Sequence, residues 1–447
     1  MITLARKEDC CGCHACETAC PTQCITMRED SEGFLYPETD VAKCIDCHLC
    51  EKVCPVINPY PRPDVFPNNL PDPLSYAAKI NDEKIREESS SGGIFTALAE
   101  AIIRRGGVVF GVRWSEDFNS VVHDYTETVE GLSAFRGSKY LQSVVGDAYK
   151  KVRTFLNAKR LVLFSGVPCH IAGLRRFLRK DYDNLFTVEV VCHGVPSPKV
   201  WRLYLDEQRS KIQHGGEAVG GMEKIQRGSL RSPGSSRESG SAVIKDIRFR
   251  SKVAPGGWKK YSYVMSHTPP QSGGKIQLRY VREHLHENVY MRAFLRDICL
   301  RPSCCECPAK NQTSLADITL GDFWGAWTHE ELSEFDDNKG TSLVCVNTEK
   351  GRALLEGVMS VGLFKEVPYE WGLKGNPALA HNPKHHPKRN LFFGKLNSGE
   401  KLYDFVFDIT KLPLKQAIRG KVFSCASSVL NKLGLLEVVK RILKKNQ

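Results

Sequence analysis

A cysteine motif that occurs twice near the start of the chain most constrains its fold. Residues 10–21 read CCGCHACETACP, and residues 44–55 read CIDCHLCEKVCP. Each copy contains Cys-x2-Cys-x2-Cys-x3-Cys-Pro, and four thiolates at these spacings can hold one cubane iron–sulfur cluster. A zinc ribbon is the alternative, but it needs only four ligands in two Cys-x2-Cys pairs. Eight cysteines in two identical runs exceed that need, so the motif favours iron–sulfur clusters.

This spacing resembles that of bacterial two-cluster ferredoxins. In that arrangement the fourth cysteine of each run binds the cluster of the other run. The resemblance therefore implies an α+β ferredoxin domain with two [4Fe-4S] clusters over residues 1–60. One cluster would be held by Cys10, Cys13, Cys16 and Cys54, and the other by Cys44, Cys47, Cys50 and Cys20. Cys24, which falls outside the spacing, is expected to be a small buried residue, and Cys11 has no predicted role.

The rest of the chain is long enough for one or two further domains. It has 447 residues, of which 41% are hydrophobic, so a full core is possible. Its 18 cysteines occur in a chain too long for a disulfide scaffold. No signal peptide is evident, and no apolar run reaches the ~18–20 residues of a membrane span. We therefore expect a cytoplasmic protein, in which thiols stay reduced.

Strands alternate with helices after a proline-rich stretch. Residues 55–73 contain seven prolines, more than a helix or a central strand would tolerate. We therefore predict an extended linker over residues 61–74. Helices are expected at 94–103, 148–156 and 168–178, and strands at 108–114, 160–164 and 185–191. This alternation predicts an α/β domain with a mostly parallel sheet over residues 75–375. It would also contain strands at 243–266 and 342–347, a helix at 283–298 and a flexible Gly/Ser-rich insertion at 214–241.

The net charge of +12 is concentrated near the C-terminus. Residues 365–447 hold 16 Lys or Arg and only 6 Asp or Glu. No nucleic-acid-binding motif accompanies this charge. We predict a basic tail over residues 376–447, either simply solvated or in contact with an acidic protein or a membrane surface.

Four segments of the middle domain carry a second resemblance, to the beta subunit of deazaflavin (coenzyme F420) hydrogenases and dehydrogenases. They read SSGGIFTALAEAIIRRG at 90–106, RGSKYLQS at 136–143, FSGVPCHIAGLRRFL at 164–178 with VVCHGVPSP at 190–198, and CLRPSCCECPAK…ADITLGDFWG at 299–325. The resemblance implies an FAD-binding α/β domain that passes electrons between iron–sulfur clusters and a two-electron substrate. No G-x-G-x-x-G or P-loop motif offers another nucleotide site.

The resemblance also implies the flavin contacts. The SSGG turn leads into a helix N-terminus, which attracts phosphate, although a plain helix cap would look the same. The RGSKY segment supplies one cation and several hydroxyls, and the resemblance assigns the ADxxxGD segment to the same pocket. The predicted FAD contacts are Ser91, Gly92, Gly93, Gly137, Ser138, Lys139, Tyr140, Ser143, Asp317, Gly321 and Asp322.

A third [4Fe-4S] cluster is implied inside this domain. By resemblance its ligands would be Cys169, Cys192, Cys304 and Cys307. The same four cysteines could instead hold zinc. Cys169 and Cys192, each followed by a histidine, could also be catalytic thiols. Cys299 and Cys305 remain without a predicted role.

Together these patterns predict a flavin- and iron–sulfur-dependent oxidoreductase whose catalytic residues and substrate are unknown. Its partner would be a redox protein or a small-molecule acceptor, and no nucleic acid. Relatives of this longer form often occur beside polysaccharide-assembly genes, which suggests a role in polysaccharide metabolism and leaves the use of the deazaflavin coenzyme open. The alternative is a non-catalytic subunit that only delivers electrons to a partner enzyme.

Overall fold

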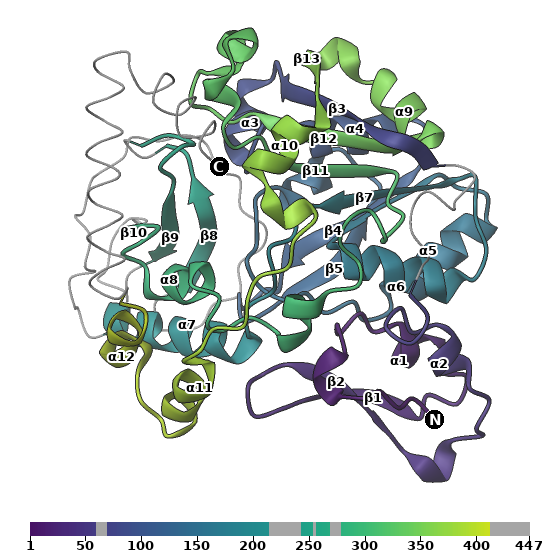
Figure 1. Ribbon diagram of the computed structural model, residues 1–447, viewed down its shortest axis with the longest axis vertical. Coiled ribbons are helices and arrows are strands. Elements are labelled where there is room, and N and C mark those ends of the chain that lie inside the picture. Colours follow the sequence, from purple (N-terminus) through teal and green to yellow (C-terminus); the bar gives the residue numbers. More distant parts are fainter. Residues whose placement is uncertain (60–68, 214–242, 254–255, 269–278, 412–447) are drawn as a thin grey trace, which may run out of the picture.

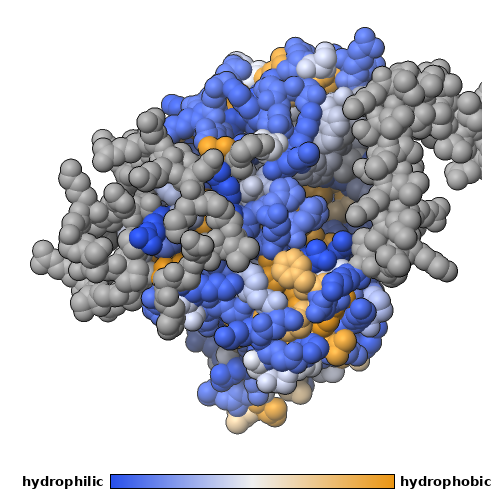
Figure 2. Space-filling model, turned by 90° about the vertical axis from the view of Figure 1, so that its left-hand side faces the viewer, coloured by the Kyte–Doolittle hydropathy of each residue, from blue (hydrophilic) through white to orange (hydrophobic). Residues whose placement is uncertain are grey.

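The computed structural model describes residues 1–59, 69–213, 243–253, 256–268 and 279–411. An N-terminal module lies against a domain built on a large sheet, and a smaller sheet with its own helices lies beside that domain (Figure 1). No helix in these ranges has the length and apolar character that crossing a bilayer would require. The side that carries α12 (Leu402–Ile409) is mostly hydrophilic, with hydrophobic side chains gathered in its lower half (Figure 2).

The N-terminal module has the internal repeat that its sequence predicts. Helices α1 (Ala15–Ala19) and α2 (Leu49–Lys52) each begin inside a cysteine run, and β1 (Ile25–Glu29) pairs with β2 (Leu35–Thr39) in an antiparallel hairpin. His14 and His48 precede the two helices in the left-handed conformation, with φ of 63° and 56°. Nδ1 of each histidine lies 2.9 or 2.8 Å from a glutamate three residues later. The sequence repeat is therefore also a structural repeat.

The large sheet has eight strands and is mixed. Its order is β13 (Gly362–Val367), β3 (Asn69–Ile80), β12 (Ser342–Thr348), β11 (Ile318–Asp322), β7 (Leu185–Val190), β6 (Val162–Gly166), β4 (Val108–Trp114) and β5 (Val121–Thr126). Only the four neighbours β11, β7, β6 and β4 run parallel. The prediction of a mostly parallel sheet is therefore wrong. Parallel neighbours need a crossover, which helices α5 (Ala148–Asn157) and α6 (Pro168–Leu178) supply, whereas β4 reaches β5 through a short antiparallel turn.

Helices cover both faces of this sheet. Helices α4 (Ile94–Arg104) and α9 (Glu349–Glu356) belong to one hydrophobic core with Val109 and Leu163, and α5 and α6 belong to another with Val108 and Phe164. Because side chains alternate between the faces of a strand, these two cores lie on opposite faces. Helices α3 (Glu83–Glu88) and α10 (Tyr369–Gly375) complete the domain. Short 3-10 turns cover Lys7–Asp9, Val41–Lys43, Glu130–Phe135, Pro302–Glu306, Ala326–Thr328, Glu330–Phe335, Met359–Val361 and Pro377–Leu379.

The smaller sheet is antiparallel, in the order β10 (Arg279–His284), β9 (Ser262–Thr268) and β8 (Val243–Ser251). It shares a core with helices α7 (Pro198–Gln213), α8 (Val289–Leu295), α11 (Arg389–Asn397) and α12. The helix expected at 283–298 is thus only half present. Glu283 pairs with β9 in a strand, and the Asn288 side chain caps α8 by accepting a hydrogen bond from the Met291 amide.

Two predicted boundaries also change. Strand β3 begins at Asn69, inside the predicted linker 61–74, and only its part from Ser75 to Ile80 lies between β12 and β13, so its prolines, Pro71 and Pro73, precede the central part of the strand. They lie where the ladder with β12 is irregular, and a bulge tolerates a missing N–H. Residues 376–411, assigned to the basic tail, instead bury Phe392, Phe405 and Val406 in the core. The rest of that tail and the insertion at 214–241 lie outside the described residues.

Candidate iron–sulfur and cofactor sites

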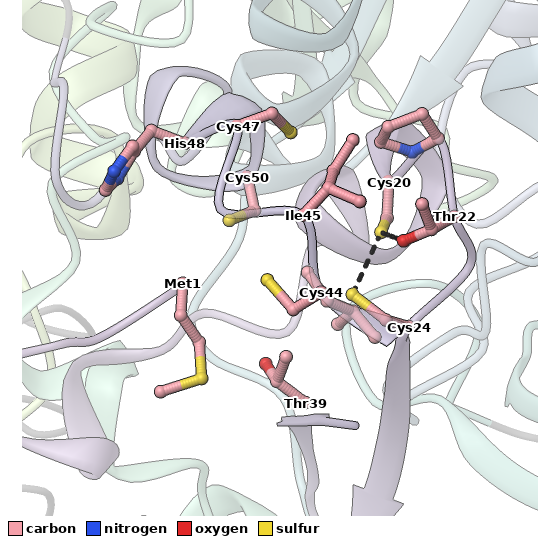
Figure 3. A pocket seen from close by; sticks show the side chains of 12 residues that line it. Met1, Cys20, Thr22, Cys24, Thr39, Cys44, Ile45, Cys47, His48 and Cys50 are labelled. Carbon is pink, nitrogen blue, oxygen red and sulfur yellow. Dashed lines mark hydrogen bonds between the residues drawn. The ribbon is translucent and has the colours of Figure 1, made fainter. Parts of the chain in front are cut away.

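Four of the predicted cluster ligands meet at one end of the N-terminal module, which we call the outer thiol site. Cys20 from the first run lines a pocket together with Cys44, Cys47 and Cys50 from the second (Figure 3). Cross-ligation predicts this grouping. Cys24 lines the same pocket, and its sulfur lies 3.4 Å from that of Cys20. Cys47 is exposed and Cys44 half-buried, so this site lies near solvent.

The other predicted ligand set is buried, and we call it the middle thiol site. Cys10, Cys13, Cys16 and Cys54 are each at most 9% exposed. Burial, together with the neighbouring Cys10 and Cys54 thiols, raises the pKa of Cys16 well above its ordinary value. The Gly12 amide donates to the Cys10 sulfur at 3.4 Å, a contact that also tunes cluster ligands.

The middle site is pressed against the large domain. Helix α6 approaches so closely that a Cβ on Gly173 would lie 2.9 Å from Cβ of Cys13. Arg301, which is fully buried, donates to the backbone oxygens of Cys10 at 2.6 Å and Leu35 at 2.8 Å. A bidentate ion pair between Arg389 and Glu32 adds a second link to the module. The first cysteine run therefore faces the domain interior.

The remaining predicted cluster ligands lie next to the middle thiol site, on the side of the large domain, and we call their position the inner thiol site. Cys169 is in the first turn of α6 and Cys192 follows β7, so two parallel strand ends bring them together. The turn Pro302–Glu306 presents Cys304, and Cys307 ends that turn. Burial, together with the Cys192 and Cys307 thiols, raises the pKa of Cys304. The four thiols are therefore neighbours, and their role as cluster ligands stays a prediction.

Cys11 lies between the middle and inner sites. Hydrogen bonds with the thiols of Cys13 and Cys169 lower the pKa of the Cys11 thiol well below its ordinary value. Cys11 and Cys169 also line one pocket, and the Gln142 side chain donates to the Cys11 backbone oxygen at 3.2 Å. No sequence pattern marks this residue, because its contact with Cys169 depends on how the module docks.

The inner thiols are protonated unless a metal centre binds them. Burial raises the pKa of Cys192 to about 12 and that of Cys307 to about 11, so a bound positive centre would be needed to hold them as thiolates. Four such sulfurs fit a cubane cluster. Within the described ranges, no three or more His, Cys, Asp and Glu side chains are arranged around a single ion position.

The geometry does not support the alternative in which Cys169 and Cys192 are catalytic thiols. His193 Nε2 lies 2.5 Å from an Asp297 carboxylate oxygen, so this ring is engaged away from Cys192. Both ring nitrogens of His170 are buried without a hydrogen-bond partner in the described part of the chain. Neither histidine is therefore placed as the base for the cysteine that precedes it.

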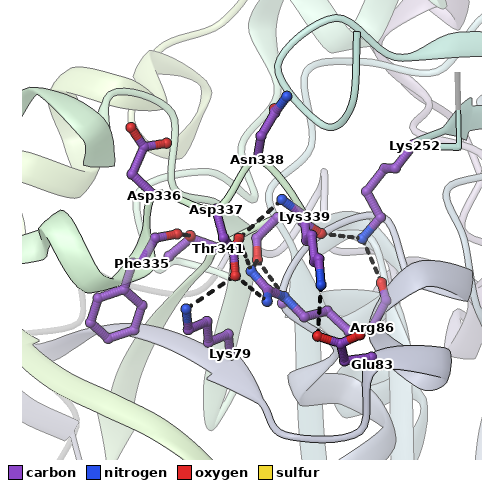
Figure 4. A network of polar contacts seen from close by, with 12 residues as sticks. Lys79, Glu83, Arg86, Lys252, Phe335, Asp336, Asp337, Asn338, Lys339 and Thr341 are labelled. Carbon is purple, nitrogen blue, oxygen red and sulfur yellow. Dashed lines mark hydrogen bonds and ion pairs between the residues drawn. The ribbon is translucent and has the colours of Figure 1, made fainter. Parts of the chain in front are cut away.

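The first two predicted flavin segments touch each other. The Ser138 amide donates to Ser90 Oγ at 2.6 Å, which joins the SSGG turn to the RGSKY segment. A Cβ on Gly92 would lie 2.3 Å from the Ala78 oxygen, so this glycine is required by packing on β3. Lys252 donates to the backbone oxygens of Ser91 at 3.0 Å and Lys339 at 2.8 Å, and it lies beside the ion pair between the buried Arg86 and the partly exposed Asp337 (Figure 4).

Several contacts hold the residues of the RGSKY segment. Gly137 has a φ of +78°, which favours glycine. Lys139 donates to the Arg136 oxygen at 3.0 Å, and burial lowers the pKa of Lys139 to about 8. Tyr140 stacks on Phe294 with ring centres 4.7 Å apart, and Ser143 is buried.

The two carboxylates and the glycine of the ADxxxGD segment mainly contact other parts of the protein. Asp317 accepts hydrogen bonds from the Thr187 amide and hydroxyl and from the Thr348 hydroxyl, all within 2.8 Å. A Cβ on Gly321 would lie 2.7 Å from a methyl carbon of Val191. Asp322 accepts from Arg250 and from the Trp258 indole. The hydrogen bonds of Asp317 thus connect neighbouring strands, whereas Asp322 forms an ion pair with Arg250. No sequence pattern distinguishes Arg250.

The comparisons with known proteins agree with these segments. Residues 75–149 match the family model for the N-terminal part of the coenzyme F420 hydrogenase/dehydrogenase beta subunit, and residues 159–370 match the model for its C-terminal part. Residues 9–58 match the model "4Fe-4S dicluster domain". A chain of the F420-reducing [NiFe] hydrogenase complex from Methanosarcina barkeri is 17% identical, over 75% of this chain and 91% of that one, with a TM-score of 0.40. No curated protein matches the chain.

Proposed function

Because the chain belongs to the coenzyme F420 hydrogenase/dehydrogenase beta-subunit family and carries a 4Fe-4S dicluster domain, we propose that it is a flavin- and iron–sulfur-dependent oxidoreductase. In this proposal the chain passes electrons between its ferredoxin clusters and a two-electron substrate. When bound, FAD would join one-electron carriers to that substrate, because a flavin can store one or two electrons.

The order of the three thiol sites is the observation that carries this proposal. The outer site is near solvent, the middle site is pressed against α6, and the inner site lies beyond Cys11. Such a row supports stepwise transfer from the surface to the interior. Arg301 and Arg389 hold the module in this position, so the chain itself fixes the spacing between the sites.

The residues near the SSGG turn suit an anionic cofactor such as FAD. Helix α4 follows Gly93 and has no side-chain cap, so no capping side chain uses its first N–H groups. Lys139 and Lys252 bond to backbone oxygens of these segments, and burial lowers the pKa of Lys252 to about 7, so a bound anion would favour its charged form. Arg250 has donors that the described protein does not use. We propose that the flavin lies among these segments.

A second candidate is a subunit that only delivers electrons to a partner enzyme. The family description of these chains as beta subunits supports a redox partner protein. Turnover of a small-molecule acceptor by the isolated chain would favour the enzyme, and turnover only with a partner would favour delivery. The deazaflavin coenzyme, a role in polysaccharide metabolism and a membrane contact of the tail stay predictions from the sequence.

The inner site offers the sharpest test of the proposal. Anaerobically purified protein should contain about one FAD and, at four irons per cubane, about twelve irons. A Cys304→Ser/Cys307→Ser variant should lose about four irons, keep both ferredoxin clusters, and no longer reduce its flavin from the ferredoxin side. Iron and flavin analysis with rapid-mixing spectroscopy would measure this.

Cys305→Ser, which changes the half-exposed cysteine between the two ligands, is the matched control and should keep all the iron. Full iron retention in the double variant would contradict a third cluster. Loss of one zinc instead of iron would assign the inner site to a structural metal. Protein without flavin, even after FAD is added, would contradict the oxidoreductase.

A further inference from the structure

We propose that the free edge of the Arg250 guanidinium binds an oxyanion, namely a phosphate or carboxylate group carried by the flavin or by the substrate. This inference rests on the proposed function, because it places the anionic part of a ligand in the same region of the domain. Nothing in the sequence motifs or in the family comparisons assigns Arg250 a role.

The hydrogen bonds of Arg250 leave one edge of its guanidinium unused. The side chain is 3% exposed, and Nη1 donates to the Asp322 carboxylate. Nε and Nη2 are buried and have no hydrogen-bond partner among the residues that the structure describes. These two nitrogens lie on the same edge of the planar group and can form two parallel bonds to one carboxylate or phosphate. A buried charged donor without a partner is costly, so a bound anion would explain why the site is built this way.

Aromatic rings fix the direction of that edge. The guanidinium carbon lies 4.7 Å from the ring centre of Tyr261 and 5.3 Å from that of Trp324. The Trp258 ring stacks on Trp324 at 4.8 Å, and its indole nitrogen donates to the same Asp322 carboxylate. Stacking and the Asp322 bond together hold the guanidinium in place before a ligand arrives, which lowers the entropy lost on binding.

Arg250 also joins the segments that the family resemblance associates with the flavin. Burial raises the pKa of Tyr140, from the RGSKY segment, and its phenol lies near enough to Arg250 to interact with it both as a charge and as a hydrogen-bonding group. Asp322 comes from the ADxxxGD segment, and Lys252, two residues after Arg250, bonds to the SSGG turn. The phenol of Tyr140, whose O–H can donate a hydrogen bond, and the amine of Lys252 thus lie near Arg250, and such donors suit a bound anion.

A purely structural role for Arg250 would not need all of the hydrogen-bond donors that its guanidinium provides. The bond to Asp322 uses one nitrogen, which a lysine could also supply. Only arginine offers the remaining pair of coplanar donors, so the unused edge is the part of the side chain that the fold does not need.

The test uses the full-length protein, purified anaerobically with its clusters. Affinities for FAD, FMN and riboflavin are measured after flavin removal, and inorganic phosphate is titrated calorimetrically into the flavin-loaded protein. If Arg250 binds a flavin phosphate, Arg250→Gln should weaken FAD and FMN binding at least tenfold and leave riboflavin binding unchanged. If it binds a substrate anion, flavin affinities should stay unchanged and the phosphate signal should disappear in Arg250→Gln.

Arg248→Gln is the matched control, because this neighbour on β8 is 34% exposed and paired with Asp246. It should leave both measurements unchanged. If Arg250→Gln does not fold, Arg250→Lys replaces it, since it keeps the charge and can keep the Asp322 bond but loses the two-donor edge. Unchanged flavin affinities together with an unchanged phosphate titration would overturn the proposal. A wild-type protein that holds no flavin but binds phosphate through Arg250 would overturn only the flavin function.

Discussion

Individual carboxylates in this protein take roles that their motif does not reveal. Asp317 and Asp322 belong to one sequence segment and lie on or beside one strand, yet Asp317 is saturated by Thr187 and Thr348 whereas Asp322 fixes Arg250. A buried carboxylate must find donors wherever the fold supplies them, so its role follows from its surroundings. Glu189 is a third case, with hydrogen bonds from the Ser314 and Thr319 hydroxyls.

We expect Glu189 to make stability fall as the pH rises. Burial raises the pKa of Glu189 from 4.5 to about 7, so between these values the folded protein keeps a proton that the unfolded chain has lost. Stability should then decrease by about 1.4 kcal/mol per pH unit across this window and level off above it. Glu189→Gln mimics the protonated form and should raise the melting temperature at pH 8 more than at pH 5.5.

Anaerobic thermal unfolding at several pH values would measure this difference. Glu330→Gln, at an exposed position, is the control and should shift neither curve. Parallel pH profiles for wild type and Glu189→Gln would show that the carboxyl is ionised in the folded protein.

At the scale of elements, the two cysteine runs form the same structure in different surroundings. Both contain a left-handed histidine paired with a glutamate one turn later, and both lead into a short helix. His14 is 3% exposed because α1 packs under α6, whereas the side chain of His48 is 54% exposed. The repeat therefore provides two similar cluster sites, of which only one touches the domain.

Glycine in α6 makes that contact possible, and Gly173→Ala should disturb it. The added Cβ would meet Cβ of Cys13 at 2.9 Å and its sulfur at 3.1 Å, so either α6 or the first cysteine run must shift. Overpacking of this kind costs about 1–3 kcal/mol. We expect a lower melting temperature and an altered electron paramagnetic resonance signal of the middle cluster.

Gly394→Ala in α11 is the matched control, because nothing lies within 4 Å of the place that its added methyl group would take. It should stabilise the protein by about 0.5–1 kcal/mol through helix propensity. Gly173→Ala behaving like Gly394→Ala would mean that α6 and the first run are not in close contact.

For the whole molecule, the docking of the N-terminal module determines which cluster site is exposed to solvent. The outer site includes the exposed Cys47 and the half-buried Cys44, whereas every ligand of the middle site is buried. Oxygen and an external electron carrier should therefore both reach the outer cluster first.

Exposure to air should accordingly remove iron in two phases. The fast phase should release about four irons, the content of one cubane, and Cys47→Ser protein, which lacks the outer cluster, should not show it. Iron analysis and paramagnetic resonance over time would follow both phases. A fast phase that persists in Cys47→Ser would mean that the buried site is the more accessible one.

Local patterns in the sequence were sufficient for several features. The spacing of Cys44, Cys47 and Cys50 and the helices after Gly93 and Val167 depend on neighbouring residues, so the sequence alone predicts them. Turn glycines and apolar periodicity act over a few residues and need no knowledge of the rest of the chain. The matching family models confirm the resemblance that these motifs indicated.

Contacts between distant segments decided the rest. The mixed order of the sheet, the burial of residues 376–411, the position of Cys11 between two thiol sites and the unused edge of Arg250 all depend on residues far apart in the chain. A cysteine or an arginine looks the same in sequence whether it is solvated or enclosed. Only the packing of the module and the two sheets fixes which donors are paired, because burial and hydrogen bonding are properties of the assembled core.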